Sequence, residues 1–142
     1  MGTLDKERIM QYEAEIKEAQ NILAEIISTD INEFIRDSIK IRAMKYTLIV
    51  LVEAICNSCR HILAKKAHIV VEEYMEAILK MQEKGFLSDD IVGKLVPLTK
   101  LRHQLIHGYW KIEDRRLFIE TKNSLASIDQ FIKELDQFLP HP

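Results

Sequence analysis

Turn-forming residues are scarce in this chain, and their scarcity limits its fold more than any other feature. Only four glycines and three prolines occur among 142 residues, and two of the prolines, Pro140 and Pro142, stand in the last three positions. A β-sandwich or barrel needs frequent turns, which Gly, Pro, Asn and Asp usually supply. Because Ile, Leu, Glu, Lys and Ala are abundant instead, we predict an all-α protein.

The length of the chain suits one hydrophobic core, so we expect a single domain over residues 1–142. The longest apolar run covers residues 47–52, less than half of the roughly 20 residues that a membrane span requires. Acidic residues precede any apolar stretch at the N-terminus, which is not typical of a signal peptide. We therefore expect a cytoplasmic protein without a membrane partner.

Cys56 and Cys59 form a lone CxxC pair. A structural zinc site requires more ligands than this pair supplies, and a thioredoxin-like motif requires a βαβ setting that an all-helical chain lacks. We expect two ordinary helix thiols in a reducing compartment, with no metal and no cofactor.

Apolar residues recur in steps of three and four along the first part of the chain, which predicts a helix over residues 3–27. The stripe consists of Ile9, Tyr12, Ile16, Ala19, Leu23 and Ile26. Ser28, Thr29 and Asp30 then interrupt the stripe and offer an N-cap to a second helix that extends to residue 66, with a bend near Asp37 and Ser38. The centre of this second helix is so apolar that we expect it to be largely buried.

A third helix is predicted over residues 71–84, ended by Gly85, and a fourth from the cap at Ser88 to Gly108. We expect a kink or a short break at Pro97, because proline removes a backbone hydrogen bond. After a polar connection over residues 111–116, one last helix carries the stripe Leu125, Ile128, Ile132, Leu135 and Leu139. These elements predict an up-and-down bundle of four to five helices.

Charge is distributed unevenly although the net charge is only -2. Residues 1–34 hold eight acids and three bases, whereas residues 100–116 hold five bases, two acids and two histidines. The net charge argues against a general nucleic-acid binder, but a local basic surface is expected near residues 100–116. A polar line of Glu53, Asn57 and His61, at intervals of four, also runs up the apolar second helix.

Polar residues are densest at the end of the fourth helix, where Arg102, His103, His107 and Tyr109 fall within eight positions. One interpretation is a helix C-terminus that carries cations favoured by the helix dipole. A zinc site on His103 and His107 is a weaker interpretation, because the metalloprotease motif HExxH requires a glutamate where this chain has Gln104.

Metal-independent cleavage of RNA fits these residue types better. The neighbouring 2'-OH of RNA can act as an internal nucleophile, so the protein needs a group that exchanges a proton near neutral pH and a fixed positive charge on the phosphate. His107 can supply the first and Arg102 the second. A step of five residues turns an ideal helix by about 140°, so either the helix loosens at Gly108 or a second copy of the chain completes the site in an isologous dimer.

Arg102, His107 and Tyr109 match the R-x4-H-x-Y motif, and in this respect the chain resembles the HepT-like proteins of the HEPN superfamily. The segments 46–63 and 108–114 are also similar to the family's second helix and to its motif exit. The order of the helices and the chain length agree with the family over nearly the whole sequence.

The resemblance implies a toxin that is a metal-independent endoribonuclease and acts as a homodimer. Arg102 and His107 would be catalytic, and no cofactor would be needed. The partner implied is an MntA-type nucleotidyltransferase antitoxin, which would transfer AMP to Tyr109. The added phosphate charge and bulk would block an anionic substrate.

Supporting roles are expected for His103, Glu53 and Asn57. His103 stands where relatives often carry Asn, and Glu53 is expected to pair with Arg102 inside the bundle and to fix its orientation. Two other functions stay open. The bundle could be a non-catalytic module that binds nucleotide or substrate for a nucleotidyltransferase, or a plain dimeric scaffold.

Overall fold

The computed structural model describes residues 4–108 and 111–139. Within these ranges the chain forms helices and no strand, which confirms the predicted all-α class. The seven helices are α1 (Lys6–Ile27), α2 (Ile31–Phe34), α3 (Ser38–Ala67), α4 (Tyr74–Glu83), α5 (Asp89–Gly108), α6 (Asp114–Leu125) and α7 (Ile128–Asp136).

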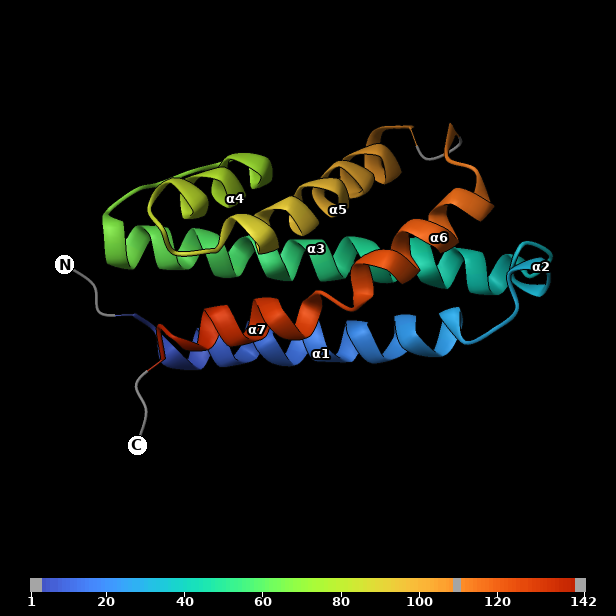
Figure 1. Cartoon of the computed structure of the whole chain (residues 1–142), viewed down its shortest axis with the longest axis horizontal. Coiled ribbons are helices and arrows are strands. Elements are labelled where there is room, and N and C mark those ends of the chain that lie inside the picture. The colour runs from blue at the N-terminus through green and yellow to red at the C-terminus, as the bar shows by residue number, and fades with distance from the viewer. Residues whose placement is uncertain (1–3, 109–110, 140–142) are drawn as a thin grey trace.

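The longest helix, α3, lies in the middle of the bundle (Figure 1). It packs against α1 on one side and against α4 and α5 on the other. Helix α7 lies along α1, where Gln20 Nε2 donates a hydrogen bond to Asp129 Oδ1 at 3.0 Å. Helix α6 contacts both α1 and α5, so it joins the two sides of the bundle.

The core is built around the apolar face of α3, as the sequence predicts. Its fully buried side chains include Met44, Leu48, Leu51, Ile55 and Ile62. By length and apolar composition α3 could cross a membrane, but 67% of its apolar window is buried inside the protein. That degree of burial is typical of a core helix. The stripe of α1 is also buried, apart from the half-buried Tyr12.

Three aspartates start the first three helices. Asp5 accepts from Arg8 N, Asp30 from Asn32 N, and Asp37 from Ile39 N and Lys40 N. Each carboxylate satisfies backbone donors that have no partner within the first helical turn. The Asp30 cap is confirmed. The cap at Asp5 makes α1 begin later than residue 3, and the cap at Asp37 divides the predicted second helix into α2 and α3.

The predicted start of the third helix was wrong, whereas its end is confirmed. Helix α4 begins at Tyr74 instead of residue 71, because Arg60 Nε donates to the Val71 carbonyl at 3.0 Å and holds this segment outside the helix. Gly85 has a φ of +72°, a conformation that glycine adopts without strain. Phe86 N then donates to the Met81 carbonyl at 2.8 Å and closes the helix.

Pro97 lies inside α5 without breaking it, so the break considered for this position does not occur. The carbonyl that a proline ring crowds belongs to the residue four positions earlier, which here is Gly93. Beyond the neighbouring backbone of α5 itself, no atom lies within 4 Å of the position that a Cβ on Gly93 would occupy, so no other part of the described chain crowds this turn. The Ser88 cap is confirmed, since Ser88 Oγ accepts from Ile91 N at 3.2 Å.

The single last helix that the apolar stripe predicts is two helices in the structure. Helix α6 already begins at Asp114, within the segment predicted to be a polar connection. A turn in which Ser127 N donates to the Ser124 carbonyl at 3.0 Å separates α6 from α7. The seven described helices thus exceed the four to five predicted, because two long predicted helices are each interrupted.

Glu13 is a carboxylic acid on the core side of α1, and it is only 9% exposed. Burial, together with a hydrogen bond to Asp136 and repulsion from it, raises the pKa of Glu13 from 4.5 to about 8. The folded protein therefore keeps a proton on Glu13 that the unfolded chain releases above pH 4.5.

Replacing Glu13 with glutamine is expected to stabilise the protein at alkaline pH. Between pH 4.5 and pH 8 the folded protein holds a proton that the unfolded chain has released. The free energy of unfolding of the wild type therefore falls as the pH rises, by at most about 1.4 kcal/mol per pH unit. In urea denaturation, Glu13→Gln should unfold at higher urea than the wild type at pH 8 and at nearly the same urea at pH 5. The exposed Glu18 on α1 gives the control, Glu18→Gln. If the stability of the wild type and that of Glu13→Gln changed with pH in the same way, the raised pKa of Glu13 would be contradicted.

Candidate active site

Arg102 reaches from α5 to both α3 and α4. Its Nη2 donates to Glu53 Oε2 of α3 at 3.1 Å, so the expected ion pair is present. The guanidinium carbon also lies 4.5 Å from the centre of the Tyr74 ring of α4, a distance at which a cation is attracted to the ring face. With its side chain only 19% exposed, Arg102 is fixed between two helices.

Tyr74 is the residue of this site that the sequence analysis missed. It lies 28 positions before Arg102 in the chain. The predicted helix begins at residue 71, so the sequence does not mark Tyr74 as the first residue of a helix. Burial, and after it the nearby Glu53 carboxylate, raises the pKa of Tyr74, so its hydroxyl stays neutral. Only the packing of α4 against α5 shows that the ring lies against the guanidinium.

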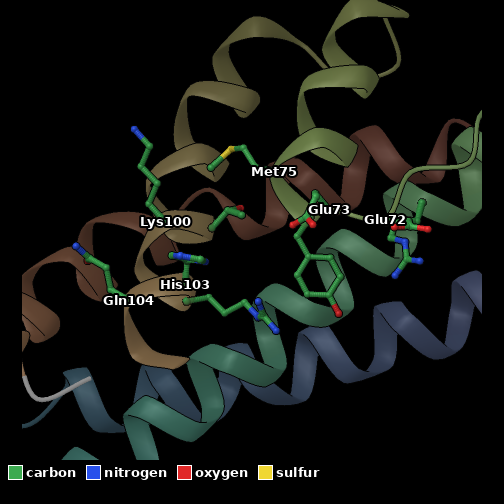
Figure 2. Close-up of a pocket in the computed structure, with 10 residues that line it drawn as sticks. Glu72, Glu73, Met75, Lys100, His103 and Gln104 are labelled. Atoms are coloured by element: carbon green, nitrogen blue, oxygen red, sulfur yellow. The ribbon is translucent and has the colours of Figure 1, made fainter. Parts of the chain in front are cut away.

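A cavity of about 610 Å³ opens beside Arg102, between α5 and the start of α4 (Figure 2). Lys100, His103 and Gln104 lie on the α5 side of it, facing Glu72, Glu73 and Met75 (Figure 2). The remaining lining residues are Arg60, Tyr74, Thr99 and Arg102. The α5 side thus carries Lys100 and Arg102, the start of α4 is preceded by Glu72 and Glu73, and Arg60 of α3 adds a further positive charge. The basic surface expected over residues 100–116 stays a prediction.

His107 lies outside this cavity, exposed on α5. Its ring stacks on that of His103, with centroids 4.4 Å apart and an angle of 44° between the planes. Helix α5 keeps its regular course through His107 and ends at Gly108. The helix therefore does not loosen before His107. Arg102 has its contacts on α3 and α4, whereas the ring contact of His107 is with His103 of its own helix.

The polar line on α3 does not form one continuous site. Asn57 Oδ1 accepts from Arg60 Nη1 at 3.4 Å, so Asn57 supports an arginine of the cavity wall. His61 faces the other side of the bundle, where its Nε2 accepts from Asp5 N at 3.0 Å. Burial lowers the pKa of His61, which favours the neutral ring that can accept this bond. Residues spaced by four drift around a helix, and over eight residues Glu53 and His61 reach different neighbours.

Tyr109, the expected acceptor of AMP, lies outside the described residues. Among residues 4–108 and 111–139, no group of three or more His, Cys, Asp or Glu side chains is arranged to hold a metal ion. Cys56 and Cys59 are free thiols buried in α3, as expected. Burial raises the pKa of Cys56 to about 12 and that of Cys59 well above its usual value.

The helical bundle and the arginine-lined cavity define the class, an all-α protein with an R-x4-H-x-Y motif at the end of one helix. The chain belongs to the Ribonuclease HepT-like family, whose model matches residues 16–135. The resemblance stated from the motif is thereby confirmed. A comparison with curated proteins finds no match.

Two solved structures share the fold. One is a toxin-antitoxin crystal structure with AMP-PNP, with a TM-score of 0.82 and 16% identity, covering 90% of this chain and 97% of that chain. The other is YutE from Bacillus subtilis, described as a cytosolic protein of unknown function, with a TM-score of 0.75 and 18% identity, covering 100% of this chain and 99% of that chain. At these identities the similarity establishes the fold.

The two cysteines are expected to react with a thiol reagent only when the protein unfolds. Both are fully buried, and a raised pKa leaves almost no reactive thiolate at pH 8. With DTNB at pH 8, the native protein should release little chromophore over minutes, and both thiols should react together in guanidinium chloride. The control Lys66→Cys, at an exposed position of α3, should add one rapidly reacting thiol. Rapid labelling of the native wild type would contradict the burial.

Proposed function

We propose that this protein is the ribonuclease toxin of a toxin–antitoxin pair and that it cleaves RNA without a metal ion. Family membership supports ribonuclease chemistry. The observation that carries the proposal is the fixed guanidinium of Arg102, which is held by Glu53 and Tyr74 at the wall of a cavity. A guanidinium in this setting can stabilise the extra negative charge of a phosphate under attack.

In the proposed reaction the 2'-OH of a ribose attacks the adjacent phosphorus, and the bond to the 5'-oxygen of the next nucleotide breaks. His107 transfers the protons that this exchange requires, because an imidazole can accept or donate near neutral pH. Arg102 stabilises the pentavalent phosphorane. His103 stacks on His107 and limits the orientations of its ring.

The proposed enzyme is a homodimer, because the two catalytic groups of one copy have their contacts on different helices. Arg102 lies against α3 and α4, whereas His107 is exposed on α5. An isologous dimer places the same surface of both copies together, so two ends of α5 can face each other across one cleft. In this arrangement His107 of one copy can serve a phosphate that Arg102 of the other copy holds.

The proposed control of the toxin is transfer of AMP to Tyr109 by an MntA-type nucleotidyltransferase antitoxin. Tyr109 follows His107 by two positions in the chain. A nucleotide attached there would add negative charge and bulk beside the cleft, which repels and excludes RNA. The proposal places this pair in the cytoplasm.

A second candidate function is a non-catalytic module that binds nucleotide for a transferase partner. The 610 Å³ cavity favours it, because a cavity with basic residues can hold a nucleotide without cleaving anything. Turnover separates the two functions, since only an enzyme produces new RNA ends.

The recombinant protein is expected to cleave RNA in the presence of EDTA. Arg102→Ala and His107→Ala should each lower the cleavage rate by about 100-fold or more, because each removes a group that acts in the transition state. Cleavage of a fluorescent RNA, followed on gels, measures this rate, and circular dichroism reports the fold. Both variants should also relieve the growth defect on expression.

Matched controls are Arg42→Ala and His68→Asn, at exposed positions outside the motif, and both should cleave RNA like the wild type. Asparagine suits position 68, where the backbone φ is +57°. Unchanged cleavage and toxicity in both motif variants would refute the catalytic assignment.

Replacing Tyr109 with phenylalanine is expected to prevent addition of AMP, because phenylalanine lacks the acceptor hydroxyl. After incubation with ATP and the cognate transferase, intact-mass spectrometry should show AMP on the wild type and none on Tyr109→Phe. The variant Tyr46→Phe, which alters an exposed tyrosine of α3, should be modified like the wild type. Modification of Tyr109→Phe would show that another residue is the acceptor.

A further inference from the structure

We propose that the cavity between α4 and α5 binds one nucleotide of the RNA substrate, beside the phosphate that Arg102 holds. This proposal rests on the proposed ribonuclease function and adds a binding site to it. The site consists of Arg60, Glu72, Glu73, Tyr74, Met75, Thr99, Lys100, Arg102, His103 and Gln104.

The size of the cavity suits a nucleotide. Its volume of about 610 Å³ lies within the roughly 300 to 1,000 Å³ typical of small-molecule sites. The Met75 side chain (Figure 2) and the Tyr74 ring, which also lines the cavity, provide apolar surface, which a base requires for stacking or van der Waals contact.

The charges of the two walls would orient the nucleotide. Lys100 on the α5 side attracts a phosphate, whereas Glu72 and Glu73 on the other side repel it (Figure 2). Arg102 of α5 adds to the attraction, and Arg60 of α3, which also lines the cavity, is engaged by the Val71 carbonyl and Asn57. Carboxylates accept hydrogen bonds, so the acidic wall can receive ribose hydroxyls or the amino groups of a base. The phosphate therefore lies toward α5, and the sugar and base lie toward the start of α4.

Arg102 has hydrogen-bonding capacity to spare for such a ligand. Within the described part of the chain, its one hydrogen bond is the bond from Nη2 to Glu53, and its buried Nε has no partner. A guanidinium carries several further N–H donors in a fixed plane. Hydrogen bonds from a charged guanidinium are strong, so a phosphate oxygen in the cavity would be bound favourably by the donors that Glu53 leaves unused.

The lining of the cavity offers a matched pair of variants for a test. Lys100 lines the cavity, whereas Lys94, also exposed on α5, does not. These two lysines form a matched pair of the same residue type on one helix.

The test is calorimetric titration of the four ribonucleoside monophosphates and of inorganic phosphate into the protein in EDTA. At least one nucleotide should bind the wild type more tightly than inorganic phosphate does. Lys100→Glu should weaken this binding by about tenfold, equivalent to about 1.4 kcal/mol. Lys94→Glu should leave it within about twofold of the wild type.

Three results would overturn the proposal: no nucleotide binding at millimolar concentration, equal binding of inorganic phosphate, or the same loss in Lys94→Glu as in Lys100→Glu. RNA cleavage assayed on the same samples separates the two proposals. Cleavage without nucleotide binding would overturn this proposal alone. Nucleotide binding that depends on Lys100, without cleavage, would overturn the ribonuclease and support the cavity as a nucleotide site.

Discussion

Burial of α3 is the constraint on which the rest of the structure depends. Its side chains contact α1, α4 and α5, and no other described helix is as long. Burying an apolar side chain contributes about 1.5 to 3 kcal/mol, so covering this helix supplies much of the driving force for folding. Polar side chains in its middle, such as Ser58, must find partners, and Ser58 Oγ donates to the Ala54 carbonyl at 2.8 Å.

Glu53 shows how this core helix also prepares the candidate site. It lies where α3 faces α5, and its carboxylate fixes the guanidinium of Arg102, while Tyr74 limits that group from the α4 side. The arginine is thus positioned before any substrate arrives, which reduces the reorganisation that binding or catalysis would require. Because the chain belongs to the Ribonuclease HepT-like family, we interpret this fixed guanidinium as a group that binds phosphate.

The helices were predictable because their signals are local. The Asp30 cap, the Gly85 end and the Gly108 end depend on residues within one turn of the boundary, and the structure has all three. Some errors were local, such as the cap at Asp37 that divides one predicted helix, and one arose where a distant contact decides. Arg60 bonds the Val71 carbonyl and delays the start of α4, and no pattern near residue 71 reveals this bond.

By itself, the sequence determined the all-α class, the buried stripe of α1, the caps at Asp30 and Ser88, and the motif formed by Arg102, His107 and Tyr109. Helical periodicity and short motifs carry that information because they depend on neighbours in the chain. Only the tertiary structure decided that Tyr74 lies against Arg102, that basic and acidic residues line one cavity, and that His107 lies outside it. Those facts depend on how α4 and α5 pack on α3, and packing brings together residues whose separation in sequence carries no signal of contact.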